Sequence, residues 1–181
     1  NLTQSIKYNH LLRIALSKKI ISISLRKRIS PKLDFNLKLI NLKREKPEYK
    51  NLKYKKILSY LLKMDNSKSD IGLVYKKKIL ETGTSNLLFI KDKKIFIPKK
   101  NYYEGNTLKF FKTKIKKIIK KDIFINELNK YDEIILIGSG KGVASVKTIN
   151  QIGWKRKNLK QFKMFSKYFA SAIKNCNQYK L

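Results

Sequence analysis

Two apolar runs, at residues 87–90 and 95–98, flank a short charged segment at residues 91–94. This arrangement predicts a β-hairpin, and therefore a sheet, because strand-forming residues bracket a turn. One carboxylate, Glu81, stands just before the hairpin and is followed by the small polar residues 82–86. Acidic residues are scarce in this chain, where Lys and Arg outnumber Asp and Glu 44 to 12. By residue type alone, Glu81 fits either a surface glutamate in a turn or a functional carboxylate.

The net charge of +32 is the most unusual property of the composition. Such a charge commonly indicates binding to nucleic acid or to an anionic membrane. A competing interpretation is that an AT-rich coding sequence favours Lys, Asn and Ile. The lysines are spread over every segment and arginine is rare, whereas nucleic-acid modules commonly carry Arg-rich patches with interleaved aromatics. The composition therefore favours the second interpretation, and binding to nucleic acid without catalysis stays the alternative hypothesis.

The chain has 181 residues, of which 42% are hydrophobic, and this suits one domain with a core better than a disordered tail. The one cysteine, Cys176, excludes an intrachain disulfide and a cysteine-based zinc cluster, and we expect it in a C-terminal helix. The single histidine, His10, has no second histidine for a metal pair, so no metal site is expected. No apolar run reaches the ~18 residues of a membrane span, and no signal-peptide pattern is present, so we expect a cytoplasmic protein. The chain opens at Asn1 without a methionine, as a fragment would.

Apolar runs, some of them alternating with polar residues, predict strands along the chain. The run at residues 134–137 is apolar throughout, which suits a strand that is buried on both faces. The other predicted strands are residues 11–16, 20–25, 35–39, 71–75 and 123–125, and a strand that begins at Ile79 and carries Glu81.

Three amphipathic patterns predict helices between and after these strands. The first helix follows Pro47, with its apolar stripe at Tyr54, Ile57, Leu58, Leu61 and Leu62. The second is capped by Asn106 and carries Leu108, Phe111, Ile115, Ile118 and Ile119 on one face. The third carries Leu159, Phe162, Phe165, Phe169 and Ile173. Strands mixed with helices in this way predict an α/β fold.

Lys50 lies one helical turn before Tyr54 and so continues the stripe of the first predicted helix. This position predicts a lysine that points toward the core or a cleft, unlike the outward Lys55 and Lys56. The alternative is a lysine whose aliphatic stem covers apolar surface while its charge stays in water.

A glycine-rich segment, residues 138–142, follows the buried strand and reads Gly-Ser-Gly-Lys-Gly. Its spacing differs from the dinucleotide-binding fingerprint, and Gly140-Lys141 lacks the Ser or Thr that follows in a phosphate-binding P-loop. The next residues, 143–149, favour a strand, whereas both nucleotide motifs require a helix there. The segment is therefore predicted to join two strands, either as a simple tight turn or as a nest of backbone N–H groups that holds an anion.

The segment that begins at Glu81 resembles the Glu-x-x-x-Ser-Asn-hydrophobic stretch of the class IV aminotransferases. Lys50 and Glu81 lie 31 positions apart, from 50 to 81, close to the interval between the cofactor lysine and glutamate of that family. Residues 49–52 resemble the hydrophobic-Lys-x-Leu entry of its lyase and D-amino-acid branches. Residues 105–107 resemble a helix entry of the family, and residues 134–146 resemble its second phosphate loop with the two adjoining strands. The resemblance extends from about Leu11 to Cys176.

This resemblance implies an enzyme of fold type IV that uses pyridoxal 5′-phosphate (PLP). The implied fold is the larger, C-terminal PLP-binding domain of the D-amino-acid-aminotransferase-like fold, a mixed β-sheet pseudobarrel with flanking helices. Residues 1–181 would form that one domain, and the family's smaller N-terminal domain, which adds an arginine to the phosphate site, would be absent. Family members are commonly homodimers, so the resemblance also implies a homodimer.

The resemblance assigns a role to each of six residues. Lys50 would supply the amine that attacks PLP, because partial burial and the nearby cofactor lower a lysine pKa. Glu81 would face the pyridine nitrogen and keep it protonated. Four further residues would bind the phosphate through backbone N–H groups and hydroxyls, and these are Asn106, Thr107, Gly138 and Ser139.

The reaction itself is left open between two branches of the family. An aminotransferase passes the amine of an amino acid to a keto acid, whereas a lyase eliminates pyruvate from aminodeoxychorismate and leaves 4-aminobenzoate. The entry at residues 49–52 slightly favours the lyase or D-amino-acid branch. Three positions depart from the family pattern and imply different substrate contacts, namely Lys53, Leu108 and Gly142. No specific nucleic-acid partner and no membrane are expected for such an enzyme.

Overall fold

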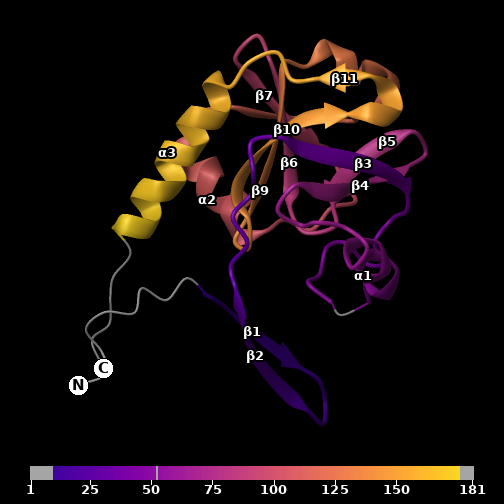
Figure 1. Ribbon diagram of the computed structural model, residues 1–181, viewed down its shortest axis with the longest axis vertical. Coiled ribbons are helices and arrows are strands. Elements are labelled where there is room, and N and C mark those ends of the chain that lie inside the picture. The colour runs from indigo at the N-terminus through magenta and orange to yellow at the C-terminus, as the bar shows by residue number, and fades with distance from the viewer. Residues whose placement is uncertain (1–9, 52, 176–181) are drawn as a thin grey trace.

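A nine-stranded mixed sheet dominates the computed structural model, which describes residues 10–51 and 53–175 (Figure 1). The strands follow one another in the order β5-β4-β3-β10-β9-β6-β7-β8, and β11 pairs with β10. Their bounds are β3 (Phe35–Asn41), β4 (Ser69–Tyr75), β5 (Lys78–Thr82), β6 (Asn86–Lys91), β7 (Lys94–Pro98), β8 (Ile118–Lys121), β9 (Glu133–Gly138), β10 (Gly142–Ile149) and β11 (Trp154–Lys155). Strand β3 is parallel to β4 and β10, and β7 is parallel to β8, whereas the other pairs are antiparallel.

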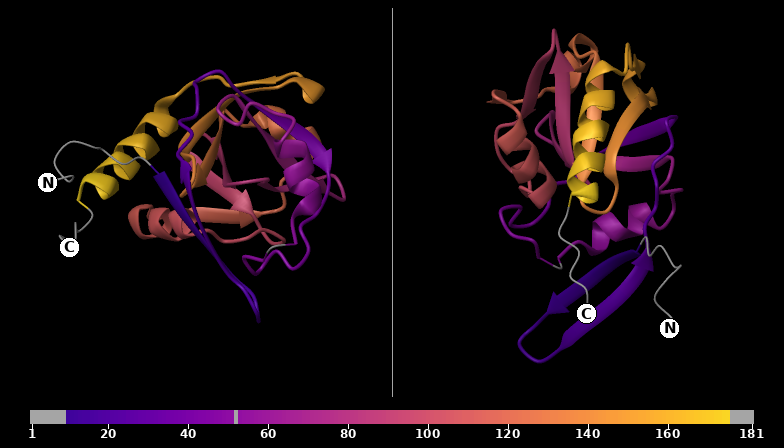
Figure 2. Two further views of the ribbon diagram at one scale, coloured as in Figure 1. Left: turned by 60° about the horizontal axis from the view of Figure 1, so that its bottom comes forward. Right: turned by 90° about the vertical axis from the view of Figure 1, so that its left-hand side faces the viewer.

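The two ends of this sheet come together, so the sheet curls toward a barrel (Figure 2). The Ile79 N–H of β5 donates to the Ile123 carbonyl at 2.9 Å, and the Ile125 N–H donates to the Lys77 carbonyl at 3.0 Å. Residues 123–125 do not form the predicted strand. They make one isolated bridge, between Lys78 and Phe124, and then enter the 3₁₀ helix η1 (Ile125–Lys130). The predicted α/β class with a mixed sheet and flanking helices is confirmed.

Burial on both faces explains why the central strands are apolar throughout. In β9, Ile134 and Leu136 pack in the cluster that includes Phe35, while Ile135 and Ile137 pack on the opposite face. That second face is covered by two helices, α2 (Asn106–Lys114) and α3 (Lys160–Lys174), which lie on the same side of the sheet (Figure 1). Side chains alternate across a strand, so a strand covered on both faces loses its polar positions.

The second and third predicted helices are present with changed bounds. Helix α3 buries Phe165 fully, against Phe111 of α2 with ring centroids 4.9 Å apart. Helix α2 ends at Lys114, and the prediction that it reached Ile118 and Ile119 is wrong. These residues belong to β8, where they pair with β7, because a β-branched residue fits a sheet edge at least as well as a helix. Cys176, predicted in the last helix, lies outside the described residues.

Helix α1 (Lys55–Leu61) begins later than predicted, and this changes the position of Lys50. The side-chain amide of Asn51 donates to the carbonyls of Glu45 and Lys46 at 2.9 and 3.2 Å. Its oxygen accepts from the Lys53 N–H at 2.9 Å, which closes a turn that competes with helix formation. Lys50 therefore lies in an irregular segment, and its predicted place on a helical stripe is wrong.

The apolar stripe of α1 is only partly buried. Ile57 and Leu61 pack against β4, and Tyr54 packs at the edge of the same cluster. Leu58 and Leu62, which the stripe also included, are exposed. The helix is only seven residues long, so fewer turns contact the sheet than the pattern predicted.

Strands β1 (His10–Leu16) and β2 (Ile21–Lys27) form a separate two-stranded ribbon, as predicted for residues 11–16 and 20–25 (Figure 1). Cross-strand pairing places Leu12 opposite Leu25, and Ile14 opposite Ile23, on one face. These four side chains are exposed, so the alternation marks an apolar face that no described residue covers. The opposite face includes Arg13, which donates to the Tyr54 hydroxyl at 3.1 Å. Within the described part of the chain, no helix is long and apolar enough to cross a membrane.

Candidate active site

Glu81, at the end of β5, is 3% exposed and both of its carboxylate oxygens are hydrogen-bonded. Its Oε1 accepts from Arg44 Nε at 3.0 Å, and its Oε2 accepts from the Tyr103 N–H at 3.3 Å. Burial raises the pKa of Glu81 above its ordinary value, whereas the charge and hydrogen bond of Arg44 and the Tyr103 N–H act in the opposite direction. The alternative of a surface glutamate in a turn is therefore wrong.

The turn after Glu81 is held by the Thr82 hydroxyl. Its oxygen accepts from the Ser85 N–H at 2.8 Å and from the Thr84 N–H at 3.2 Å. The Thr82 hydroxyl thus bonds to N–H groups that a backbone carbonyl would otherwise bind. This explains why small polar residues follow the strand here. The turn delivers Asn86 to the start of β6, where it is 5% exposed.

Asn86 connects this turn to the start of helix α2. Its Oδ1 accepts from the Gly105 N–H at 3.0 Å, and its Nδ2 donates to the Tyr103 carbonyl at 2.5 Å. Gly105 is the N-cap of α2, so the prediction that Asn106 is the cap is off by one residue. Asn106 and Thr107 are the first two helical residues, whose N–H groups have no partner within the helix. The helix dipole makes this end favourable for an anion.

The predicted strand-turn-strand arrangement at residues 138–142 is confirmed, because β9 ends at Gly138 and β10 begins at Gly142. Ile137 pairs with Asn86, which brings the turn beside residues 82–86. A Cβ at Gly138 would lie 2.9 Å from Ser85 Oγ, so only glycine fits this approach without a shift. Ser139 is exposed, and its carbonyl accepts from Arg28 at 3.2 Å.

Three segments thus meet around Ser85 and Asn86, and they carry five of the six predicted site residues. Glu81 begins the first segment, residues 81–86, Asn106 and Thr107 begin α2, and Gly138 and Ser139 lie at the turn after β9. We regard this meeting point as the candidate active site. It joins a buried carboxylate to a helix N-terminus and a glycine turn.

Lys50, the sixth predicted residue, lies on a neighbouring segment. It is exposed, and among the described residues no hydrogen bond joins its side chain to Glu81. The segment is nevertheless attached to the site through Arg44, which contacts Glu81 and donates to the Gly83 carbonyl at 3.3 Å. The nearby Lys53 forms an exposed ion pair with Glu45 at 3.5 Å.

Sequence reasoning missed Arg44, Tyr103 and Asp70. Arg44 lies in a polar connection without periodicity, and it meets Glu81 across 37 positions of sequence. Tyr103 takes part through its backbone, which no residue type indicates. Asp70 is fully buried near the start of β4. It could have been found from the sequence because it is one of the chain's few carboxylates and stands beside an apolar run.

Solved structures with the same fold include two aminotransferases and one protein described as a lyase. A branched-chain aminotransferase from Thermoproteus uzoniensis, solved with norvaline, has a TM-score of 0.71 at 13% identity, with 84% of this chain and 56% of that chain covered. The PLP form of a branched-chain amino acid aminotransferase from Thermobaculum terrenum has a TM-score of 0.68 at 14% identity, with 84% and 56% covered. A Legionella pneumophila protein described as a 4-amino-4-deoxychorismate lyase has a TM-score of 0.68 at 15% identity, with 83% and 60% covered.

At these identities the solved structures establish the fold alone, and this chain spans between 56% and 60% of their lengths. No curated protein is significantly similar to the chain in sequence. The sequence family described as amino-transferase class IV, however, matches residues 9–149, which is most of the chain. The chain therefore belongs to the class IV aminotransferase family.

Proposed function

We propose that this chain forms the PLP-binding part of a class IV enzyme that acts on an amino acid or on aminodeoxychorismate. The observation that carries the proposal is the buried Glu81 beside the N-terminus of α2 and the turn at residues 138–142. The proposal extends, through the family, to a homodimer in the cytoplasm. The proposed activity is that of the whole protein, because this chain covers only 56% and 60% of the lengths of two solved structures that it resembles.

The residues of the candidate site fit PLP in their chemistry. Glu81 offers a buried carboxylate to the pyridine nitrogen, and Arg44 favours its ionised form. Thr107 is buried in the first turn of α2, where its hydroxyl is suited to donate to a phosphate oxygen. The N–H groups of Asn106 and Thr107 and the Ser139 hydroxyl complete a set suited to a dianion.

When bound, PLP supplies an aldehyde that reacts with amines and a protonated ring that withdraws electrons from the substrate α-carbon. Glu81 would keep the proton on the ring nitrogen, since an ionised carboxylate accepts that N–H. Lys50 would hold the resting cofactor through its amine and would then serve as the general base for the substrate α-proton.

An absorbance titration with PLP tests this proposal, because PLP bound through a lysine absorbs in the visible. The titration compares the chain as printed with a longer protein that includes the full length of its relatives. A saturable visible band in either protein supports the proposal, and its absence from both refutes it. With the longer protein, amino acids plus a keto acid are then compared with aminodeoxychorismate, and release of 4-aminobenzoate identifies the lyase branch.

Thr107 and Ser139 offer a direct test of the phosphate site. Changing both to alanine should weaken PLP affinity by about tenfold or more for each lost hydrogen bond, because a bond to a charged group contributes roughly 1.5–3 kcal/mol. The backbone donors remain, so binding weakens without vanishing. Fluorescence titration gives the dissociation constant, and Thr113→Ala, at the other end of α2, serves as the control. Equal affinity in the double variant would place the phosphate elsewhere.

Arg44 makes the stability of the chain depend on pH in a predictable way. In Arg44→Met only the Tyr103 N–H still opposes the effect of burial, so the pKa of Glu81 rises further. Keeping Glu81 ionised then lowers the unfolding free energy by about 3–5 kcal/mol at neutral pH. Protonation of Glu81 removes that cost. The loss relative to the unchanged protein should therefore shrink as the pH falls through the raised pKa toward 4.5. Urea unfolding at several pH values measures it, and a loss independent of pH would contradict the pairing.

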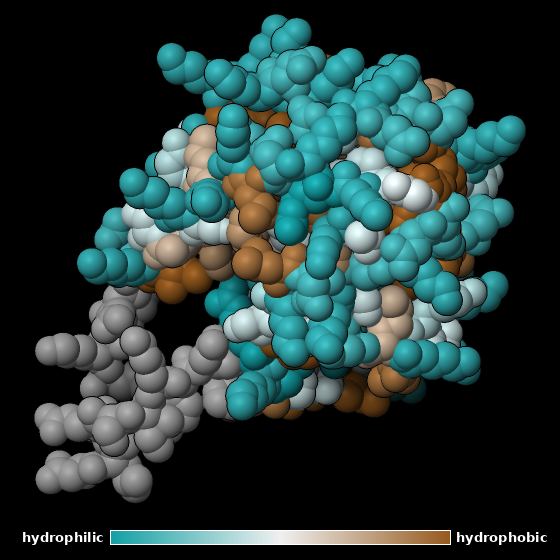
Figure 3. Space-filling model, turned by 45° about the horizontal axis from the view of Figure 1, so that its top comes forward, coloured by the Kyte–Doolittle hydropathy of each residue, from teal (hydrophilic) through white to brown (hydrophobic). Residues whose placement is uncertain are grey.

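The charge of +32 keeps nucleic-acid binding as the second candidate function. On the face shown in Figure 3, hydrophilic side chains are spread across the face between apolar areas and do not gather into one patch. We therefore expect weak, sequence-independent affinity for nucleic acid that falls steeply with salt. Filter binding of several oligonucleotides at two salt concentrations measures this, and a tight, sequence-selective complex at physiological salt would favour the second candidate.

A further inference from the structure

Lys141, in the turn at residues 138–142, is buried although most lysines reach water. Its Nζ lies 3.2 Å from Asp70 Oδ2, and the two side chains are 7% and 0% exposed. The same nitrogen lies 3.3 Å from the Asn66 carbonyl oxygen and 3.5 Å from that of Ser69. The aromatic ring of Phe35 lies 5.0 Å away. The ammonium is therefore held by three protein oxygens and an aromatic ring, which leave it little contact with water.

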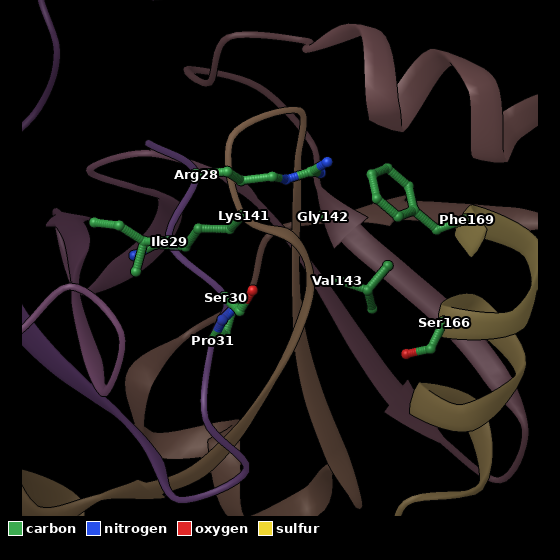
Figure 4. Close-up of a pocket in the computed structure, with 9 residues that line it drawn as sticks. All are labelled: Arg28, Ile29, Ser30, Pro31, Lys141, Gly142, Val143, Ser166 and Phe169. Atoms are coloured by element: carbon green, nitrogen blue, oxygen red, sulfur yellow. The ribbon is translucent and has the colours of Figure 1, made fainter. Parts of the chain in front are cut away.

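Lys141 is not placed to contact a phosphate itself. An ammonium has three protons, and these three oxygens account for all of them. Figure 4 shows the Lys141 side chain extending away from Phe169, whereas the Arg28 guanidinium lies beside that ring at the other side of the turn. The turn thus exposes Ser139, whereas Lys141, its only cationic side chain, is buried.

Asp70 joins this lysine to the turn that follows Glu81. Its Oδ2 accepts from the hydroxyls of Thr82 at 3.0 Å and Thr84 at 2.6 Å, and its Oδ1 accepts from the Ile71 N–H. One buried carboxylate therefore bonds to both turns, which are far apart in sequence. Glu81 directly precedes the first of these turns, and Ser139 lies in the second. Glu81 is proposed to contact the pyridine nitrogen of PLP, and Ser139 its phosphate.

We propose that the Lys141–Asp70 ion pair positions the turn at residues 138–142 for phosphate binding, a role that rests on the proposed function. Three glycines make this turn flexible by itself, so it needs an anchor to hold Ser139 and its N–H groups in place. The pair supplies that anchor, and it fixes the distance from the phosphate-binding turn to Glu81. Lys141 and Asp70 are positioning residues that act through Ser139 and the turn backbone.

The two ligands PLP and pyridoxal test this role, because pyridoxal has the same ring and aldehyde but no phosphate. Lys141→Met keeps the aliphatic stem against Phe35, and Asp70→Asn keeps an oxygen for the threonine hydroxyls. Each variant should raise the dissociation constant for PLP about tenfold while that for pyridoxal changes less than about twofold. The double variant should match the worse single variant, since both remove one interaction. Lys141→Arg should recover part of the affinity.

Two controls separate positioning from general damage. Lys78→Met breaks an ion pair with Asp122 at 2.6 Å on β5 and should change neither affinity. Thr84→Val keeps the Lys141–Asp70 pair and removes one hydrogen bond to Asp70, together with a contact to the Ser85 hydroxyl at 3.3 Å. It should alter the PLP-to-pyridoxal ratio in the same direction even where the Lys141 variant fails to fold. Equal weakening of both ligands, or unchanged PLP affinity in folded variants, would overturn the inference. Failure of the unchanged protein to bind PLP would overturn the proposed function first, and the inference with it.

Discussion

Lys50→Ala is expected to abolish turnover of the full-length enzyme. Under the proposed function the variant would lose both the amine that holds the cofactor and the general base at the substrate α-carbon, and a general base alone contributes about 10²–10⁴-fold. The fold should survive, because Lys50 is exposed in an irregular segment and surface substitutions change stability little. Steady-state kinetics of a purified, folded variant measures the effect.

Lys53→Ala is the matched control for this variant. Lys53 lies three residues away in the same segment, and its exposed ion pair with Glu45 contributes only about 0–1 kcal/mol. Turnover should stay near that of the unchanged protein. Loss of turnover in Lys53→Ala with an active Lys50→Ala would reverse the two assignments, and equal activity in both would remove Lys50 from the mechanism.

Glu81→Gln is expected to retain PLP and to lose turnover by about 10²–10³-fold, the size of effect seen when one preorganised electrostatic contact is removed. An amide has no negative charge and cannot keep the pyridine nitrogen protonated, whereas its shape preserves most packing around the buried position. Binding by absorbance and turnover by kinetics separate the two effects. Glu48→Gln, an exposed glutamate on the segment of Lys50, is the control, and an unchanged turnover number in Glu81→Gln would refute the assignment.

Elements with strong local patterns could be predicted from the sequence. The hairpin of β6 and β7 has apolar runs around a turn at Asp92 and Lys93, both with positive φ. Strand β9 and helix α3 also follow from continuous and helical patterns. Helix ends were less predictable because competing interactions decide them. The Asn51 side chain delays α1, and pairing with β7 takes Ile118 out of α2.

The resemblance to a family names residues of the candidate site that are far apart in sequence. Five of the six residues meet around Ser85 and Asn86, while their roles remain predictions. Contacts between distant segments could not be read from spacing. The Arg44–Glu81 and Lys141–Asp70 pairs depend on how the strands order themselves in the sheet, and that order is set by packing over the whole core.

Borohydride reduction of the PLP-loaded protein, followed by peptide mapping, tests the central claim most directly. Reduction fixes the pyridoxyl group permanently on the lysine that carried it, and mass spectrometry then identifies that residue among the many lysines of the chain. The account predicts one major label, on Lys50, and none in Lys50→Ala. Label on Lys53 would mean that the segment at residues 50–54 is assigned in the wrong register. Label spread evenly over surface lysines would contradict the account, because it would mean that the chain has no dedicated PLP site.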